Sequence, residues 1–281
     1  MRYTVTLLIS VTLCFTAQSL ALRAFGGRTV KSESNFFSSI GRIQAGTVAK
    51  PEVMLLGSSI TGRLPDRANG FEGFANMGCD GGSAVDVLRA MDSGILPIAP
   101  ILVIEANTLS KALDPTPSEV GRAMASPWFR LGMGVPPLSA YARPSAFFYS
   151  ILLAHRTGDY GDPLSEEDLK VSSLPHSLER NPTTVLTAVE TALKHELVAV
   201  TGRLSAKGSR IIFVWLPPAC ADGSKIPGWL HELIAESGSQ WWNLGNEADP
   251  RLVTLTDGIH MAAPSAARTV ISLRKGLPQG R

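Results

Sequence analysis

Short apolar runs recur along the chain and are separated by stretches in which apolar and polar residues mix. The runs at residues 53–56, 100–106 and 210–217 are dominated by consecutive aliphatic residues, which is typical of strands buried on both faces of a sheet. Shorter runs at 73–76 and 240–245 predict two further strands. The pattern therefore predicts a five-stranded sheet.

Stretches with helical spacing of apolar residues lie between and after these strands. They cover residues 83–94, 181–208, 228–238 and 263–277, and apolar positions recur in them at the period of an amphipathic helix. The apolar face of the longest helix is predicted to consist of Leu186, Val189, Leu193, Leu197, Val200 and Leu204. This alternation predicts an α/β protein, a three-layer α/β/α sandwich around a mainly parallel sheet.

The N-terminal segment has a different character. Within residues 1–22, the stretch from Tyr3 to Leu22 is mostly apolar and lies between Arg2 and Arg23. Small residues at Ser19 and Ala21 suit cleavage by a signal peptidase, so we expect an export signal. An uncleaved membrane anchor is the alternative, because the segment is long enough for a span. Either one places the body of the protein on the exported side, periplasmic or extracellular, and an anchor would associate it with the membrane.

The remaining chain divides into a short lead-in and one domain. Residues 23–50 are rich in serine and glycine and predict a linker or a lead-in helix. Residues 51–281 carry all the predicted strands and form the domain. Within it, residues 111–181 hold many prolines and aromatic residues, which predicts an insertion of short helices and loops. The insertion forms either a lid or wall over a site or an irregular packed excursion.

The composition limits the classes of partner. Of 281 residues, 44% are hydrophobic and 18% are charged, and the net charge is +2. A sizeable core can therefore form, and the chain lacks the dense basic run expected of a nucleic-acid-binding protein. We expect small molecules or carbohydrates as partners, with no cofactor. We expect no metal either, because the HEL sequences at His195 and His231 lack the second histidine of a zinc helix.

Two cysteines lie beyond the N-terminal segment. Cys79 and Cys220 either form a disulfide in an oxidising compartment or are two isolated residues of the core. The sequence leaves both alternatives open.

Polar residues that can carry chemistry follow the predicted strands. Ser59 follows the first strand, Gly81 lies in the glycine-rich segment after the second, and Asn107 follows the third. Asp257 and His260 come after the fifth strand. Because the carboxyl ends of parallel strands meet at one edge of a sheet, we expect these groups to lie together.

These residue types suit acyl transfer through a nucleophilic serine. A serine hydroxyl needs an imidazole to take its proton, and an aspartate fixes the tautomer of that imidazole and stabilises its charged form. Backbone N–H groups and an asparagine side chain supply donors for a developing oxyanion. Plainer interpretations also exist, namely a helix cap for Ser59, turns for Gly81 and Asn107, and a surface position for His260.

Four short blocks resemble, in order along the chain, those of the SGNH (GDSL-type) superfamily of esterases and acyltransferases. GSSI resembles the first block, NMGCDGG the second, EAN the third and DGIH the last. The resemblance implies a flavodoxin-like fold in which Ser59 is the nucleophile and Asp257 and His260 complete a triad. It also implies an oxyanion hole formed by Ser59, Gly81 and Asn107.

Two positions depart from the pattern of the superfamily. Ser58 stands where the first block usually has aspartate, and Glu105 stands where the third usually has glycine. Neither position belongs to the triad. Glu105 adds a carboxylate near the site, which is either paired away or directed off the site. The resemblance covers residues 53–108 and 210–270 and says little about the insertion.

The resemblance implies an exported serine esterase that hydrolyses acyl esters, with acetyl groups on a carbohydrate or another envelope substrate as the expected case. The alternative is an O-acyltransferase that passes the acyl group from Ser59 to an exported polysaccharide. The N-terminal segment and the aromatic insertion favour the transferase, whereas the prevalence of hydrolases in the superfamily favours the esterase. A non-catalytic binding module is a third interpretation, which the intact set of serine, aspartate and histidine disfavours.

Overall fold

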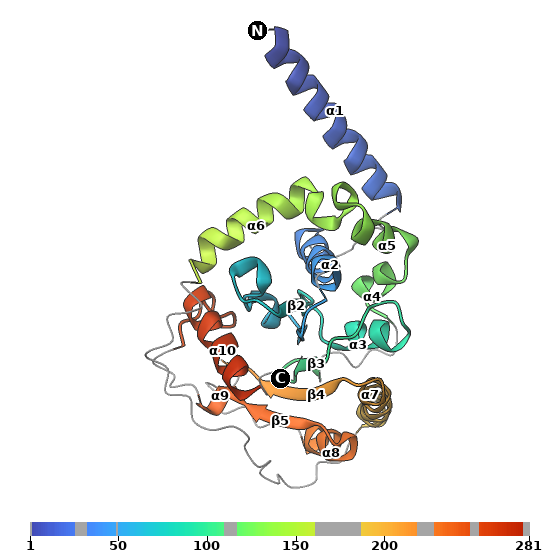
Figure 1. Ribbon diagram of the computed structural model, residues 1–281, viewed down its shortest axis with the longest axis vertical. Helices are drawn as coiled ribbons and strands as arrows, with labels where there is room; N and C mark the ends of the chain where they lie inside the picture. The colour runs from blue at the N-terminus through green and yellow to red at the C-terminus, as the bar shows by residue number, and fades with distance from the viewer. Residues whose placement is uncertain are drawn as a thin grey trace.

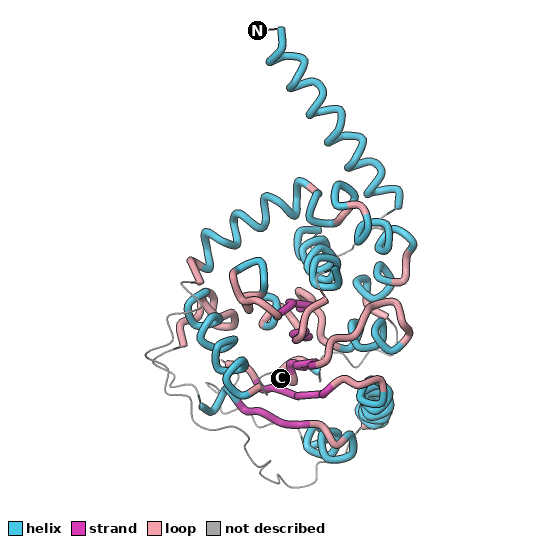
Figure 2. The backbone as a smooth tube through the Cα atoms, viewed as in Figure 1, coloured by secondary structure: helices cyan, strands magenta, loops and turns pink. Residues whose placement is uncertain are grey.

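The computed structural model of the chain describes residues 2–25, 33–48, 50–109, 117–160, 187–217, 228–247 and 253–277. Figure 1 labels its helices and strands, and Figure 2 separates helices, strands and loops by colour. In chain order the elements are α1 (Arg2–Phe25), α2 (Glu33–Val48), β1 (Val53–Gly57), η1 (Thr61–Arg63), η2 (Arg67–Asn69), β2 (Phe74–Gly78), α3 (Val85–Asp92), β3 (Ile101–Glu105), α4 (Glu119–Met124), α5 (Pro127–Gly134), η4 (Pro136–Leu138), η5 (Ala140–Ala142), α6 (Pro144–Thr157), α7 (Ala188–Ala206), β4 (Arg210–Trp215), α8 (Gly228–Ser237), β5 (Gln240–Asn243), α9 (Leu244–Glu247) and α10 (Ala263–Gly276).

The strands form one sheet in the order β2-β1-β3-β4-β5, and every neighbouring pair is parallel. The prediction of an α/β protein with a parallel five-stranded sheet is confirmed. From β1 the chain passes to β2 on one side and then, through α3, to β3 on the other side. The carboxyl ends of β1 and β3 thus flank the point where the connections reverse, and doubly wound sheets hold ligands at such a point.

Alternate strand residues enter two apolar cores, one on each face of the sheet. Met54 and Leu56 of β1 belong to the core that includes residues of α2, α3, α7 and α8. Val53 and Leu55 of the same strand belong to the core that includes residues of α10. Figure 2 shows the magenta strands with helices on either side. Helices on both faces are consistent with the three predicted layers.

The strand boundaries differ from their predictions by one or two residues: the fifth strand, for example, ends at Asn243 and not at residue 245, because α9 begins at Leu244. The difference in the second strand changes the loop near the site. The sequence places the second strand at 73–76, but β2 runs on to Gly78 because its last residues pair with Leu55, Leu56 and Gly57 of β1. Asn76 therefore lies inside the sheet, and the glycine-rich loop begins only after Gly78.

The long helix α7 begins after the predicted start at residue 181. Thr187 and Glu190 form a capping box at its N-terminus, which satisfies backbone donors of the first turn. Residues 181–186, and with them the predicted contact of Leu186, lie outside the described residues. Val189 is 48% exposed, contrary to its prediction, because the buried face of α7 begins one turn further along the helix. The other predicted core residues are buried, namely Leu193, Leu197, Val200 and Leu204.

Residues 33–48, for which the sequence allows a linker or a lead-in helix, form α2. Phe36, Phe37, Ile40 and Ile43 of this helix are buried in the core that it shares with α3. The helix packs against β2. A domain that begins at residue 51 therefore leaves out a helix that contributes to its core.

The described part of the insertion, residues 117–160, consists of short helices joined by turns. Ser118 and Ser126 cap the first turns of α4 and α5 with their hydroxyl groups. α4, α5 and α6 all contact α2, and Figure 1 shows them grouped next to that helix. The remainder of the predicted insertion lies outside the described residues.

Helix α1 projects from the rest of the molecule in Figure 1. Its described side chains are exposed. In the part of the chain that the structure describes, no helix combines the length and the apolar character needed to cross a membrane.

The cysteine alternatives remain as the sequence leaves them. Cys79 is buried at the end of β2. Cys220 lies outside the described residues, so the disulfide stays a prediction.

Candidate active site

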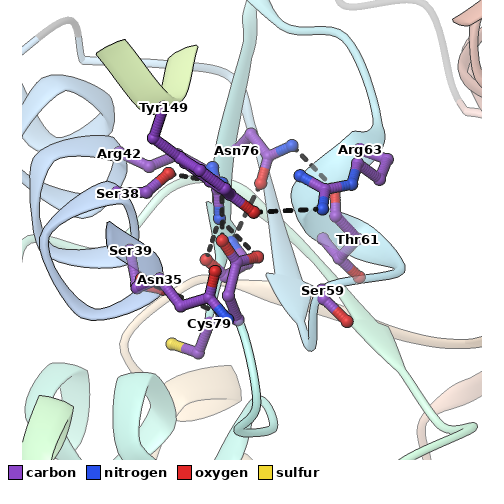
Figure 3. A network of polar contacts seen from close by, with 12 residues as sticks. Asn35, Ser38, Ser39, Arg42, Ser59, Thr61, Arg63, Asn76, Cys79 and Tyr149 are labelled. Atoms are coloured by element: carbon purple, nitrogen blue, oxygen red, sulfur yellow. Dashed lines mark hydrogen bonds and ion pairs between the residues drawn. The ribbon is translucent and has the colours of Figure 1, made fainter. Parts of the chain in front are cut away.

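Strand β1 ends in a tight turn that places Ser59 at the carboxyl edge of the sheet. β1 ends at Gly57, and the N–H of Gly62 donates to the carbonyl oxygen of Ser58 over 2.9 Å. The chain then continues through η1. Ser59 is half-buried, and Figure 3 shows it at the end of the same turn as Thr61.

The side chains of Ser59, His260 and Asp257 form one chain of hydrogen bonds. Oγ of Ser59 lies 2.8 Å from Nε2 of His260. Nδ1 of His260 lies 2.8 Å from Oδ2 and 3.0 Å from Oδ1 of Asp257. The fold thus joins residues 201 positions apart in the order in which a serine nucleophile, its base and the orienting carboxylate act.

The carboxylate of Asp257 is held in its ionised form. Burial acts to raise its pKa, but hydrogen bonds from the backbone and ring of His260 and from the N–H of Ile259 outweigh that effect. Together they lower the pKa from 3.8 to about 2. An ionised carboxylate favours a proton on Nδ1 of the ring, which leaves Nε2 to accept from Ser59.

Asp257 and His260 lie on a short loop that is held by its own hydrogen bonds. Leu255 and Met261 form an antiparallel bridge across its base. The N–H and the hydroxyl of Thr256 both donate to the carbonyl oxygen of His260, over 2.8 and 3.3 Å. The Asp-x-x-His spacing therefore folds as a local unit that directs both side chains to one side.

The backbone N–H groups of Ser59 and Gly81 have no acceptor among the described residues. In the turn 58–64, every N–H except that of Ser59 donates a hydrogen bond. In the segment 78–82, every N–H except that of Gly81 does so. The structure thus leaves free, within the part it describes, the two backbone donors predicted for an oxyanion hole.

The backbone at Gly81 explains why this position is glycine. Its φ is +74°, a conformation that residues with a side chain rarely adopt. A Cβ at Gly81 would meet no other atom within 4 Å. Backbone conformation, not crowding, therefore requires glycine here, and it sets the direction of the free N–H.

Helix α2 clamps the loop that precedes Gly81. The guanidinium of Arg42 donates to the carbonyl oxygen of Gly78 and lies 3.4 Å from a carboxylate oxygen of Asp80. The N–H of Asp80 donates to the hydroxyl of Ser39 over 2.8 Å. Burial acts to lower the pKa of Arg42, but the charge of Asp80 outweighs that effect and raises the pKa above its ordinary value, so the guanidinium keeps its charge. Figure 3 shows Ser39 and Arg42 on α2 beside this loop.

The side chain of Asn107 is fixed by the residue that follows β4. Its Oδ1 accepts from the N–H of Leu216, and its Nδ2 donates to the carbonyl oxygen of Leu216, both over 2.8 Å. An amide nitrogen carries two hydrogens, so one remains for another acceptor. Asn107 follows β3, the neighbour of β1 in the sheet, and its remaining donor belongs to the same edge as Ser59.

The two departures from the superfamily pattern contact each other. Glu105 is the last residue of β3 and is 1% exposed. Its carboxylate accepts from the N–H and from the hydroxyl of Ser58, both over 2.8 Å. Of the two alternatives for Glu105, the structure shows that the carboxylate is paired, and its partners include Ser58 and Thr61 on either side of Ser59.

The insertion contacts both parts of the site. Nη2 of Arg63, on η1, donates to the hydroxyl of Tyr149 over 3.4 Å, as Figure 3 shows. About two turns further along α6, Arg156 lies 3.2 Å from Oδ2 of Asp257. The hydroxyl of Tyr160, after α6, donates to the carbonyl oxygen of Arg63 over 3.1 Å. The described part of the insertion therefore borders the site.

Sequence reasoning names Ser59, Asp257 and His260, which the structure joins by hydrogen bonds, but it misses the residues that hold the turn, the loops and the insertion around them. Arg42, Thr61 and Arg156 carry no motif, and their partners are distant in sequence. The position of Glu105 does predict polar partners, because a charged residue at the end of a buried strand is rarely enclosed by protein without them.

Within the described ranges, no group of three or more histidine, cysteine, aspartate or glutamate side chains could hold a metal ion. The described groups at this edge of the sheet are a hydroxyl, an imidazole, a carboxylate and hydrogen-bond donors. No family model, curated protein or solved structure matches this chain.

Proposed function

We propose that the chain is an exported serine esterase of the SGNH type, which hydrolyses acyl esters through an acyl-enzyme. The expected substrates are acetyl esters of a carbohydrate or another envelope molecule. The observation that carries this proposal is the 2.8 Å contact between Oγ of Ser59 and Nε2 of His260, continued to Asp257. The strand order also supports it, because it is the order of a flavodoxin-like sheet.

Acylation would use the triad and the free donors together. Oγ of Ser59 attacks the ester carbonyl carbon while Nε2 of His260 takes the hydroxyl proton. Asp257 stabilises the imidazolium that forms. The N–H groups of Ser59 and Gly81 and the remaining Nδ2 hydrogen of Asn107 stabilise the oxyanion. His260 then returns the proton to the leaving alcohol, and the acyl group stays on Ser59.

Deacylation repeats these steps with a second nucleophile. His260 takes a proton from water, the hydroxide oxygen bonds to the acyl carbon, and the carboxylic acid leaves as Oγ of Ser59 regains a proton. When a sugar hydroxyl replaces water, the same steps transfer the acyl group. Hydrolase and transferase therefore share every residue of the site and differ in which nucleophile reaches it.

An O-acyltransferase acting on an exported polysaccharide is the second candidate. The contacts of Tyr149 with Arg63 and of Arg156 with Asp257 favour it, because they place the insertion at the border of the site. A wall at that border can limit access of water and give an acceptor a surface to lie on.

The test uses purified protein, p-nitrophenyl acetate and an acetylated oligosaccharide, each with and without an unacetylated acceptor sugar. We expect hydrolysis by the wild type and a loss of at least about 10³-fold in Ser59→Ala and in His260→Ala. Product analysis by mass spectrometry distinguishes free acetate from acetylated acceptor. An excess of acetylated acceptor over acetate selects the transferase.

Matched controls separate catalysis from general damage. Ser93, which follows α3, and His195 on α7 are exposed, so Ser93→Ala and His195→Ala should keep wild-type activity. Full activity in Ser59→Ala would contradict the proposal. A folded wild type without activity on any acyl ester would favour the binding module instead.

A further inference from the structure

Glu105 is a buried carboxylate whose contacts converge on the nucleophile turn. Five donor groups lie within hydrogen-bond distance of its two oxygens, on Ser58, Thr61 and Thr108. They are the N–H of Ser58 at 2.8 Å, its hydroxyl at 2.8 Å, the N–H of Thr61 at 3.1 Å, its hydroxyl at 2.6 Å and the hydroxyl of Thr108 at 3.0 Å. Among the described residues no cation pairs with it, and all five partners are hydrogen-bond donors, which matches the acceptor capacity of a carboxylate.

These donors lie on both sides of the nucleophile. Ser58 precedes Ser59, Thr61 follows it by two residues, and both are tied to one carboxylate that belongs to a different strand. The backbone on either side of Ser59 is therefore fixed relative to β3. The N–H of Ser59 itself has no acceptor within the described residues, which leaves it available to the site.

Gly57 permits this arrangement. A Cβ at Gly57 would overlap the hydroxyl of Thr61 and the carboxylate of Glu105. Only a residue without a side chain lets the carboxylate come so close to the end of β1. Gly57 and Glu105 are thus sterically matched, and this match explains why the first block, GSSI, begins with glycine.

We propose that Glu105 is a positioning residue of the serine site, a proposal that rests on the proposed function. It sets the backbone of residues 58–61 so that Oγ of Ser59 meets Nε2 of His260 and the N–H of Ser59 faces the oxyanion. The carboxylate that the superfamily pattern usually has at position 58 is here supplied across the sheet from position 105. The two departures from the pattern then have one explanation, since the carboxylate stands at position 105 and not at position 58.

The first measurement compares Glu105→Gln with the wild type. Glutamine keeps the shape but turns an NH₂ group toward the N–H donors of the turn, so the turn shifts. We expect kcat for p-nitrophenyl acetate to fall about 10- to 100-fold, as for a small misplacement of a reacting atom. KM should change less than about 3-fold, because the variant leaves the substrate surface intact. An unchanged kcat would overturn the proposal.

The second measurement relocates the carboxylate. Glu105→Gly removes it, and the double variant Ser58→Asp/Glu105→Gly returns it within the turn. We expect the double variant to recover at least about 10-fold of the kcat that Glu105→Gly loses. Equal activity in the single and the double variant, with both folded by circular dichroism, would contradict a positioning role.

A matched control separates positioning from stability. Thr108→Val removes a hydroxyl donor to Glu105 that lies outside the turn 58–64, whereas Thr61→Val removes one within it. We expect Thr61→Val to lower kcat at least about 3-fold more than Thr108→Val. Equal losses of kcat in the two variants would show that Glu105 acts only through stability.

A covalent probe distinguishes failure of this proposal from failure of the proposed function. A fluorophosphonate forms a phosphorus–oxygen bond with an activated serine and releases fluoride. If Ser59 is labelled at the same rate in the wild type and in Glu105→Gln, the positioning role alone is overturned. Wild type that neither reacts with the probe nor hydrolyses esters overturns both.

Discussion

The turn that carries Ser59 and the loop that carries Asp257 and His260 meet at a single hydrogen bond, but they are held in different ways. In the turn, Ser58 and Thr61 are 3% and 1% exposed and bind the carboxylate of Glu105. The loop is largely exposed and is closed by contacts among residues a few positions apart.

The turn is therefore fixed by contacts with a neighbouring strand of the sheet, whereas the loop is fixed by contacts within itself. A buried polar network in a low-dielectric interior resists displacement, because each unpaired group would be costly. An exposed loop is closed by a few hydrogen bonds that water can replace. We therefore expect changes in the loop to act on chemistry with little effect on folding, and changes in the turn to act on both.

The largest expected effect in the loop comes from Asp257→Asn. The amide keeps the size of the side chain but favours the wrong imidazole tautomer, so kcat for p-nitrophenyl acetate should fall about 10³- to 10⁴-fold. The midpoint of thermal unfolding should fall by only a few degrees, because the ionised carboxylate contributes about 1–2 kcal/mol to the stability of the fold. A loss below about 10-fold would show that the carboxylate is not part of the catalytic set.

At the edge of the sheet, Asn107→Ala removes a donor from the proposed oxyanion hole. We expect kcat to fall about 10²- to 10³-fold and KM to change little. Asn107→Asp is the matched variant, since it keeps an acceptor for the N–H of Leu216 but adds a charge that repels the oxyanion. An Asn107→Asp enzyme as active as the wild type would contradict this role.

A smaller effect is expected from the protonation of Asp257. Its pKa is about 2 in the folded protein against 3.8 as reference. The ionised form therefore stabilises the fold above about pH 4, and this contribution is lost as the pH falls from 4 to 2, with a size of about 1–2 kcal/mol for a partly exposed group.

Urea unfolding of the wild type and of Asp257→Asn at pH 5 and at pH 2.5 measures this contribution. The difference in unfolding free energy between the two proteins should shrink at the lower pH. A difference that stays constant would mean that the bonds to His260 and Ile259 do not lower the pKa.

The smallest effect is expected from Arg156→Ala. The guanidinium lies 3.2 Å from Asp257, but its side chain is 58% exposed, and exposed ion pairs contribute little. We expect kcat for p-nitrophenyl acetate to change less than about 3-fold and the unfolding free energy to change less than about 1 kcal/mol. A tenfold change would mean that α6 tunes the triad rather than only bordering it.

The difference between local and long-range contacts also decides which residues of the site can be predicted from the sequence. Asp257 and His260 are three residues apart and bind each other, so their spacing alone suggests the pair. Ser59 follows a strand whose apolar run is visible, so its position at the edge of the sheet follows from the parallel arrangement.

The supporting contacts cannot be read in this way. Glu105 binds residues 44 and 47 positions away, and Arg42 reaches Asp80 over 38. Such contacts depend on strand order and register, which apolar periodicity does not determine. The extra residues of β2 and the burial of α2 are likewise set by tertiary packing, which overrides weak local patterns.

Trapping the acyl group on Ser59 tests directly whether this residue forms an acyl-enzyme. Wild type is mixed with p-nitrophenyl acetate, quenched with acid within the first turnovers, digested and analysed by mass spectrometry. We expect one acetyl group on the peptide that contains Ser59, and none on that peptide in Ser59→Ala or in His260→Ala. Hydrolysis by the wild type with no acetyl group on Ser59, even when deacylation is slowed by low temperature, would contradict this expectation.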